Sequence, residues 1–270
     1  MNTLRASFVG AAAFFLSTVL GRGALIAGWD FQGTTDPSGP IGTVIFMPPT
    51  TPRVFVANAG AFQSTSSLYL DGTNGSSSFF VGTINGDSEL GALNGITANT
   101  AGTNFATVTG SPNGGSMALF NRTAQGGIDG KSMVFKLSMD GYEALEFSLA
   151  VQRPVSSGGD YGVSLFTFLY SLDGTTFLPW GQIDTGFATS VINQAYTLTP
   201  VLNAVNDADT VYIKMTVSGS TNGINSTRID NIQFNASVVP ENGTAAGVIT
   251  AIGLIALRRN RTSRVVHPAR

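Results

Sequence analysis

The sequence predicts an all-β protein, an antiparallel β-sandwich of jelly-roll-like type, and three observations support this. Glycine occurs 33 times and Ser, Thr and Asn are abundant, whereas runs of Lys or Glu are absent, a composition that disfavours helices. Short apolar stretches are separated by turn-forming residues, as in strands joined by turns. Between the two terminal segments, no amphipathic pattern extends over three helical turns.

Two segments give the clearest strand signal. In residues 144–152 and 211–218 every second residue is apolar, the pattern of a half-buried antiparallel strand. Residues 163–170 are apolar on both faces, so we expect this strand near the centre of a sheet. The remaining predicted strands are shorter and cover residues 25–31, 43–46, 67–70, 79–81, 117–120, 133–139 and 228–234.

Turn and loop signals lie between these strands. Asp140-Gly141 and Asp173-Gly174 supply the left-handed backbone conformation that hairpin turns need. Residues 34–52, 71–78 and 85–115 are rich in Gly, Asn, Ser, Thr or Pro and are predicted to be long loops in the first half. No internal repeat is present, which argues against a solenoid or a propeller.

Residues 1–27 have the layout of a secretory signal peptide. One basic residue precedes an apolar run over residues 8–20, and small residues follow. Cleavage after Gly23 places small residues at the minus-one and minus-three positions, whereas cleavage after Ala27 places Leu25 at minus three. An uncleaved anchor or a buried helix is the alternative interpretation.

Charge and cysteine content limit the function of the body, which is predicted to be a single domain over residues 28–237. The chain has a net charge of −2, but seven of its 14 basic residues lie in the terminal segments. Seven basic and fifteen acidic residues remain between positions 28 and 240, a net charge of −8. This balance excludes nucleic acid as a partner, because phosphates require clustered Lys and Arg. Without cysteine, the fold has no disulfides.

The C-terminal region contains an apolar run over residues 244–257. At about 1.5 Å per residue it spans about 21 Å as a helix, less than the hydrocarbon core of a bilayer, about 30 Å. We therefore predict a short hydrophobic helix that holds the chain in a membrane only temporarily, with arginines on the cytoplasmic side. A polar motif, Val239, Pro240 and Glu241, precedes the run, and a basic stop, Arg258, Arg259 and Arg261, follows it.

This arrangement resembles the PEP-CTERM sorting tails of Gram-negative bacteria, which combine a Val-Pro-Glu-Pro motif, a hydrophobic helix and an arginine cluster. Residues 239–241 match the motif, while Asn242 stands in place of the second proline. The resemblance covers residues 238–264 and implies recognition by an exosortase-type membrane processing enzyme, transient contact with the bacterial membrane, and delivery to the cell surface. A plain tail anchor is the alternative interpretation. We expect residues 265–270 to be a cytoplasmic stub.

Asp230 lies on the predicted closing strand and shares a face with Ile232 and Phe234, so we expect it to point toward the core. A buried carboxylate must be hydrogen-bonded, paired or bound to metal. The Ile-Asp-Asn-Ile phrase around it resembles the closing strand of galactose-binding-like jelly rolls. In some of those domains the aspartate helps to hold a structural calcium beside the first strand. Here the first strand, residues 25–31, would place Asp30 near Asp230. The alternative is that Asp230 accepts backbone N–H groups or pairs with Arg228 or Arg153.

The residue inventory provides no catalytic constellation. The single histidine, His267, lies beyond the arginine stop, and cysteine is absent, so Ser-His-Asp, Cys-His and histidine-ligated zinc sites are excluded. We therefore assign no catalytic residue, metal or cofactor. Two carboxylate pairs, Glu143 with Glu146 and Asp207 with Asp209, are expected on the solvated surface.

Aromatic side chains are the remaining candidates for ligand binding. Trp180 follows a proline at a predicted strand end and is the ring that we expect to be exposed, as a glycan contact. The favoured function is an exported, non-enzymatic cell-surface or extracellular-matrix protein. The alternatives are a carbohydrate-binding module that recognises exopolysaccharide, and a glycoside hydrolase built from carboxylates alone. The other candidate rings, for which core packing is expected, are Trp29, Tyr142, Tyr161, Tyr170 and Tyr196.

Overall fold

The computed structural model describes the β-rich body and leaves the predicted signal segment before residue 23 and the tail after residue 240 outside the described residues. Glu241, the basic stop and the stub therefore lie outside it, as do most of the loops predicted at 34–52 and 85–115. The described residues are 23–31, 44–46, 53–80, 89–94, 115–120, 127–153, 162–186, 192–219 and 226–240.

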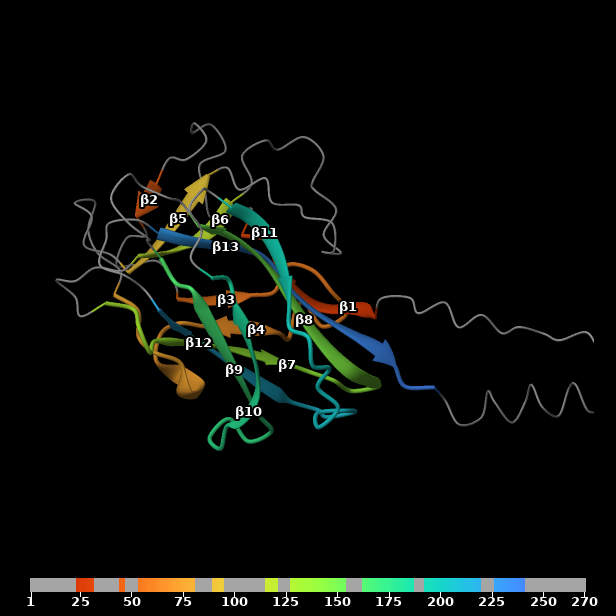
Figure 1. Cartoon of the computed structure of the whole chain (residues 1–270). Coiled ribbons are helices and arrows are strands. Elements are labelled where there is room, and N and C mark those ends of the chain that lie inside the picture. Colours follow the sequence, from red (N-terminus) through yellow and green to blue (C-terminus); the bar gives the residue numbers. More distant parts are fainter. Residues whose placement is uncertain are drawn as a thin grey trace, which may run out of the picture.

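Within these residues, the strands form two antiparallel sheets that pack face to face, which confirms the predicted β-sandwich (Figure 1). The strand β1 (Ala24–Trp29) pairs with β13 on the side opposite β8. The seven-stranded sheet otherwise has the order β11 (Ile192–Thr197), β8 (Tyr142–Arg153), β13 (Ser226–Val238), β6 (Gly115–Phe120), β5 (Leu90–Asn94) and β2 (Val44–Phe46).

The second sheet has six strands and every neighbouring pair in it is antiparallel. A short 3-10 turn, η2 (Thr73–Gly75), follows its strand β4. The order of this sheet is β10 (Leu178–Asp184), β9 (Leu165–Ser171), β12 (Val211–Ser218), β7 (Ser132–Leu137), β4 (Ser67–Tyr69) and β3 (Val54–Val56).

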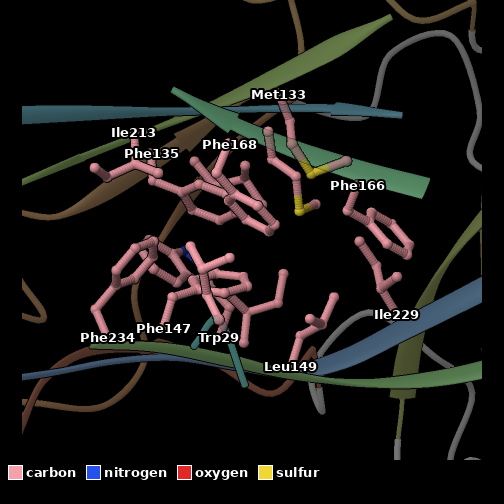
Figure 2. Close-up of a cluster of buried hydrophobic side chains, with 14 of the residues drawn as sticks. Trp29, Met133, Phe135, Phe147, Leu149, Phe166, Phe168, Ile213, Ile229 and Phe234 are labelled. Atoms are coloured by element: carbon pink, nitrogen blue, oxygen red, sulfur yellow. The ribbon is translucent and has the colours of Figure 1, made fainter. Parts of the chain in front are cut away.

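Interlocking aromatic rings fill the space between the sheets (Figure 2). The ring of Phe147 lies 4.7 Å from that of Phe168 and 5.0 Å from that of Phe234, measured between centroids. Phe135 meets Phe234 at 5.1 Å. The indole Nε1 of Trp29 donates a hydrogen bond to a backbone carbonyl, which satisfies its one polar group. Because truncating a buried Phe costs about 3–5 kcal/mol, this cluster compensates for the absence of disulfides.

Most predicted strands are present, with shifts of a few residues at their ends. The strand predicted at 79–81 is wrong: Phe79 and Phe80 belong to no strand, and the guanidinium of Arg53 donates to the carbonyl of Phe79 at 2.7 Å. β9 is one strand from the edge rather than central, and one of its faces is only half-buried. The strands β3, β5, β10 and β11 were not predicted; β3 and β5 lie next to predicted loops or within them.

The two predicted hairpin turns have different outcomes. Asp173-Gly174 joins β9 to β10 in one sheet and is a hairpin turn, as predicted. Asp140-Gly141 joins β7 to β8, which belong to different sheets, so it is a crossover between the layers. Gly141 still has the expected left-handed φ of +74°. A turn signal therefore specifies local geometry but not which strand pairs with which.

β1 begins and β13 ends at the same end of the sandwich (Figure 1). Ala24 pairs with Ala236, and a β-carbon added at Gly23 would lie 2.6 Å from the backbone of Ala236. The boundary that we expected after residue 27 falls inside β1, where Ile26 and Ala27 are fully buried. Residues 24–27 are therefore part of the folded sheet.

Candidate functional site

The prediction that Trp180 is exposed is wrong, because its side chain is buried and only 9% exposed. The register of β10 shifts between Pro179 and Gly181, and the indole turns inward there. Its Nε1 donates to the carbonyl of Pro200 at 2.7 Å, and its ring meets that of Phe168 edge-on at 6.1 Å. The other predicted rings within the described residues, Trp29, Tyr142, Tyr170 and Tyr196, pack in or against the core, as expected.

The predicted sorting motif begins directly after the last strand. The backbone N–H of Val239 donates to the carbonyl of Gly141 at 2.9 Å, so the motif starts against the folded body without a spacer. Pro240 is exposed, and the rest of the motif lies outside the described residues. Within the described ranges, no helix is long and apolar enough to cross a membrane.

The predicted carboxylate pairs do not form a site. Glu143 and Glu146 are half-exposed on β8, and Asp207 and Asp209 are exposed, as expected for solvated groups. Asp207 accepts a hydrogen bond from the backbone N–H of Gly141 at 2.9 Å, so its carboxylate stabilises the crossover turn.

Asp230 is buried as predicted, but on the other face of the seven-stranded sheet. Asn231 has a left-handed φ of +47°, and the register shifts between Asp230 and Gln233. This bulge changes the phase of the alternation. Ile229 therefore faces the core, and Asp230 lies on the outer face opposite Ala150.

The carboxylate of Asp230 is incompletely hydrogen-bonded. Its Oδ1 accepts the backbone N–H of Asn231 at 2.6 Å, which confirms the backbone alternative, and its Oδ2 has no hydrogen-bond partner. Burial raises the pKa of Asp230 well above its ordinary value, and the nearby carboxylate of Asp30 raises it further. Arg228 does not pair with Asp230; its guanidinium donates to the side chain of Gln152.

These surroundings do not fit the calcium site that the galactose-binding-like resemblance implies. Calcium takes about six to eight oxygen ligands, several of them charged. In the part of the chain that the structure describes, no three His, Cys, Asp or Glu side chains converge. The carboxylate of Asp30 accepts a hydrogen bond from the amide nitrogen of Asn58. An N–H donor therefore lies beside this carboxylate, where a bound cation would need an oxygen ligand. We therefore assign Asp230 no metal.

The outer face of the six-stranded sheet is where exposed aromatic and charged side chains meet. Burial along β12 alternates strictly: its apolar residues face the core, while Tyr212, Lys214 and Thr216 are half-exposed on the other side. Directly paired residues of neighbouring strands share a face. Tyr212 pairs with Lys136 of β7, and Thr216 pairs with Thr167 of β9, so these side chains share the outer face.

The strand β4 adds a second tyrosine to this face. Val134 of β7 pairs with Lys214 on one side and with Tyr69 on the other. Tyr69 is half-exposed. With strands about 4.8 Å apart, Tyr69 and Tyr212 lie two strands and two residues apart, on the order of 12 Å between their backbones. The ammonium of Lys136 lies 5.9 Å from the centroid of the Tyr212 ring.

A third ring reaches the face from the hairpin between β9 and β10. The ammonium of Lys214 lies 5.0 Å from the centroid of Phe177. A β-carbon added at Gly75, at the end of η2, would lie 3.2 Å from the ring of Phe177 and 3.8 Å from Nζ of Lys214. Phe177 is thus held between η2 and Lys214, and each such cation–π contact contributes about 0.5–1 kcal/mol at an exposed site.

The hairpin that carries Phe177 is fixed by Asp173. The carboxylate accepts the backbone N–H groups of Thr176 at 2.7 Å and Thr175 at 2.8 Å, and the hydroxyl of Ser171 at 2.8 Å. These hydrogen bonds, that from Thr176 foremost, hold the pKa of Asp173 well below its ordinary value. The hairpin is therefore a preformed part of the face rather than a loose loop.

We name the set Tyr69, Lys136, Phe177, Tyr212 and Lys214 the tyrosine–lysine face. It combines aromatic rings, which can stack on apolar ligand surfaces, with ammonium groups, which can bind polar ones. Thr167 and Thr216 lie on the same side of the sheet. Sequence reasoning placed Tyr212 and Lys214 on the outward side of their strand, but it did not single out either tyrosine as a binding residue.

No protein-family model matches the chain, and no curated protein matches it. Among solved structures, a cleaved adhesin domain of Lys-gingipain from Porphyromonas gingivalis is 13% identical, with a TM-score of 0.34 over 55% of this chain and 91% of that one. TmCBM61 in complex with β-1,4-galactotriose is 10% identical, with a TM-score of 0.31 over 55% of this chain and 83% of that one.

A Stig cyclase from Fischerella sp. TAU is also similar, at 12% identity and a TM-score of 0.36, over 73% of this chain and all of that one. Likeness at this level does not extend to individual binding residues. The kind of ligand that the tyrosine–lysine face can bind therefore follows from its own side chains.

Proposed function

We propose that the protein is an exported, non-enzymatic surface protein whose β-sandwich binds polysaccharide through the tyrosine–lysine face. The observation that carries this proposal is that two half-exposed tyrosines share the outer face of one sheet. Pyranose rings present apolar C–H surfaces that stack on aromatic rings, and their hydroxyls need hydrogen-bond partners. Thr167 and Thr216 lie opposite each other on this face and supply such partners.

Export is proposed from the terminal segments. The signal-peptide layout at the N-terminus and the resemblance of the tail to PEP-CTERM signals support secretion, processing by an exosortase-type enzyme and display at the cell surface. The two ends of the body are side by side, since β1 begins next to the end of β13. Both terminal segments are thus joined to the body at the same end of the sandwich.

The test is affinity electrophoresis of the full-length chain in native gels that contain one polysaccharide each. We expect at least one polymer to retard the protein, and Tyr69→Ala or Tyr212→Ala to weaken this retardation about tenfold, since stacking contributes about 1–1.5 kcal/mol per ring. Tyr196→Ala is the matched control, because Tyr196 is a half-buried tyrosine on the other sheet. Unretarded migration in every gel would refute the proposal.

A further inference from the structure

The lysines of this protein are unevenly distributed. The chain contains only three, Lys131, Lys136 and Lys214. Lys131 forms an ion pair with the fully buried carboxylate of Glu89 and is thereby occupied. Lys136 and Lys214 lie together on the outer face of the six-stranded sheet, in neighbouring strands. Two of three lysines therefore belong to the tyrosine–lysine face.

Within the described residues, neither of these two lysines forms a salt bridge. Among the described residues, the ion pair of Lys131 is the only salt bridge that forms. The ammonium of Lys136 faces the ring of Tyr212, and that of Lys214 faces the ring of Phe177. An ammonium held over a ring keeps its full positive charge and its free N–H donors. Both cations are therefore available to an incoming anion.

The spacing of the two lysines suits a polymer rather than a single small anion. Lys136 pairs with Tyr212, and Lys214 pairs with Val134, so the lysines are diagonal neighbours on β7 and β12. Diagonal neighbours on one face have Cα atoms about 7–8 Å apart, and the two ammonium groups face different rings, Lys136 that of Tyr212 and Lys214 that of Phe177. They can each hold one anionic substituent of successive units in a chain.

From these observations we infer that the polysaccharide bound by the tyrosine–lysine face is an anionic one, whose carboxylate or sulfate groups are held by Lys136 and Lys214 while its rings stack on Tyr69 and Tyr212. This inference rests on the proposed function and names the substrate class of the same site. The body carries a net charge of −8, so a polyanion is repelled everywhere except where cations are exposed. Binding of such a polymer is therefore local to this face.

Two aspartates limit the extent of the site. Asp71 follows β4, and its carboxylate accepts the backbone N–H of Thr73 at 3.0 Å and its hydroxyl at 2.6 Å. Asp173 is fixed in the hairpin between β9 and β10. At Asp71 the effect of burial, which raises the pKa, is outweighed by the hydrogen bonds from Thr73 and the charge of Arg53, so the pKa is lowered; at Asp173 hydrogen bonds hold the pKa well below its ordinary value. Both carboxyls are therefore ionised at neutral pH. Each carboxylate therefore repels an anionic substituent that comes close to it.

The experiment is affinity electrophoresis of the full-length chain in gels that contain alginate, dextran sulfate, or the neutral polymers dextran and hydroxyethylcellulose. We expect retardation by at least one anionic polymer and little by the neutral ones, with a loss of retardation as salt is raised. The double variant Lys136→Gln/Lys214→Gln is expected to bind up to about thirtyfold more weakly, because each charge contact contributes up to about 1 kcal/mol. Lys136→Arg/Lys214→Arg is expected to retain binding.

The possible outcomes separate the two proposals. Two results would overturn the anionic substrate class and leave the polysaccharide-binding function in place. One is that neutral polymers retard the protein as much as anionic ones do; the other is that anionic polymers retard the glutamine double variant as much as the wild type. Migration unaffected by every polymer would overturn both. Alginate and dextran sulfate distinguish carboxylate from sulfate recognition. Thermal melts of each variant check that the sandwich remains folded, since both lysines are half-exposed and away from the core.

Discussion

Gly174 and the ring of Tyr212 are packed so closely that a β-carbon on Gly174 would lie 3.2 Å from Cζ of the tyrosine. Gly174 has a φ of +72°, the left-handed conformation that side chains disfavour. This residue therefore serves two purposes: it makes the turn of the hairpin, and it leaves room for the ring beside it. The position of Tyr212 on the tyrosine–lysine face depends on that room.

We predict that Gly174→Ala weakens polysaccharide binding as well as stability. The left-handed conformation costs a residue with a β-carbon about 1–2 kcal/mol, and the added methyl group displaces the ring of Tyr212. Gly141→Ala is the matched control, because Gly141 has a φ of +74° and no atom lies within 4 Å of its added β-carbon. Melting temperature and gel retardation are measured for both. Equal binding losses in the two variants would contradict the role of the contact.

Removing the buried hydrogen bond of Trp180 is expected to affect stability alone. In Trp180→Phe the ring still fills its place against Phe168, but the carbonyl of Pro200 loses its donor. A typical hydrogen bond contributes about 1 kcal/mol, so the unfolding free energy falls by about that amount. Polysaccharide retardation is expected to remain at the wild-type level. A binding loss without destabilisation would return Trp180 to the ligand site.

Strict alternation is what allowed the sequence to predict part of the face. β12 alternates over its full length, so Tyr212 and Lys214 are placed outward from the sequence alone. The outward orientation of Tyr69 was not predicted because β4 has only three residues, too few for a periodic pattern. The position of Phe177 was not predicted because this residue lies between two strands, in a hairpin that brings its ring to Lys214. Tertiary contacts, which the local sequence does not encode, decide both positions.

Register shifts explain the two orientation errors. The alternation in β13 changes phase at Asn231, so Asp230 moves from the predicted core face to the outer face. In β10 the shift beside Trp180 occurs where the sequence shows only a proline before an aromatic residue. A bulge adds one residue to a strand without any obligatory sequence signal, and it changes the alternation, so that one pattern no longer predicts the faces of the residues on both sides of it.

Asp230 is expected to make stability depend on pH. Its folded-state pKa is raised above the unfolded value of 3.8, so the folded protein binds this proton more tightly. The contribution is fully present below the unfolded pKa and is lost as pH rises toward the folded-state pKa. In melts from about pH 4 to about pH 8, Asp230→Asn is expected to lose less stability than the wild type, because an amide does not ionise.

The exposed aspartate Asp209 provides the control for this experiment. Asp209→Asn is expected to follow the wild-type pH dependence, and identical curves for all three proteins would exclude Asp230 as the titrating group. Added chelator is expected to leave every melting temperature unchanged, since no three potential ligands converge in the described part of the chain. A melt that falls on chelation would instead favour a bound cation at Asp230.

The pairing of β1 with β13 predicts where the exported protein is cut. Cleavage after Gly23 leaves all six residues of β1, including the buried Ile26 and Ala27, whereas cleavage after Ala27 removes both. Intact-mass analysis of protein from the cell surface is therefore expected to show Ala24 as the first residue. Gly21→Leu, which places a large residue at minus three, is expected to leave the precursor uncut.

The same spectrum tests the C-terminal end. The sorting motif starts against the folded body, where Val239 donates to Gly141, so removal of the tail is expected between residues 240 and 242. Such a cut leaves β13 whole, because that strand ends at Val238. A surface form that still contains residues 258–270 would contradict processing of the tail and favour a plain membrane anchor. A first residue at Gly28 would mean that most of β1 is dispensable, contrary to the burial of Ile26 and Ala27.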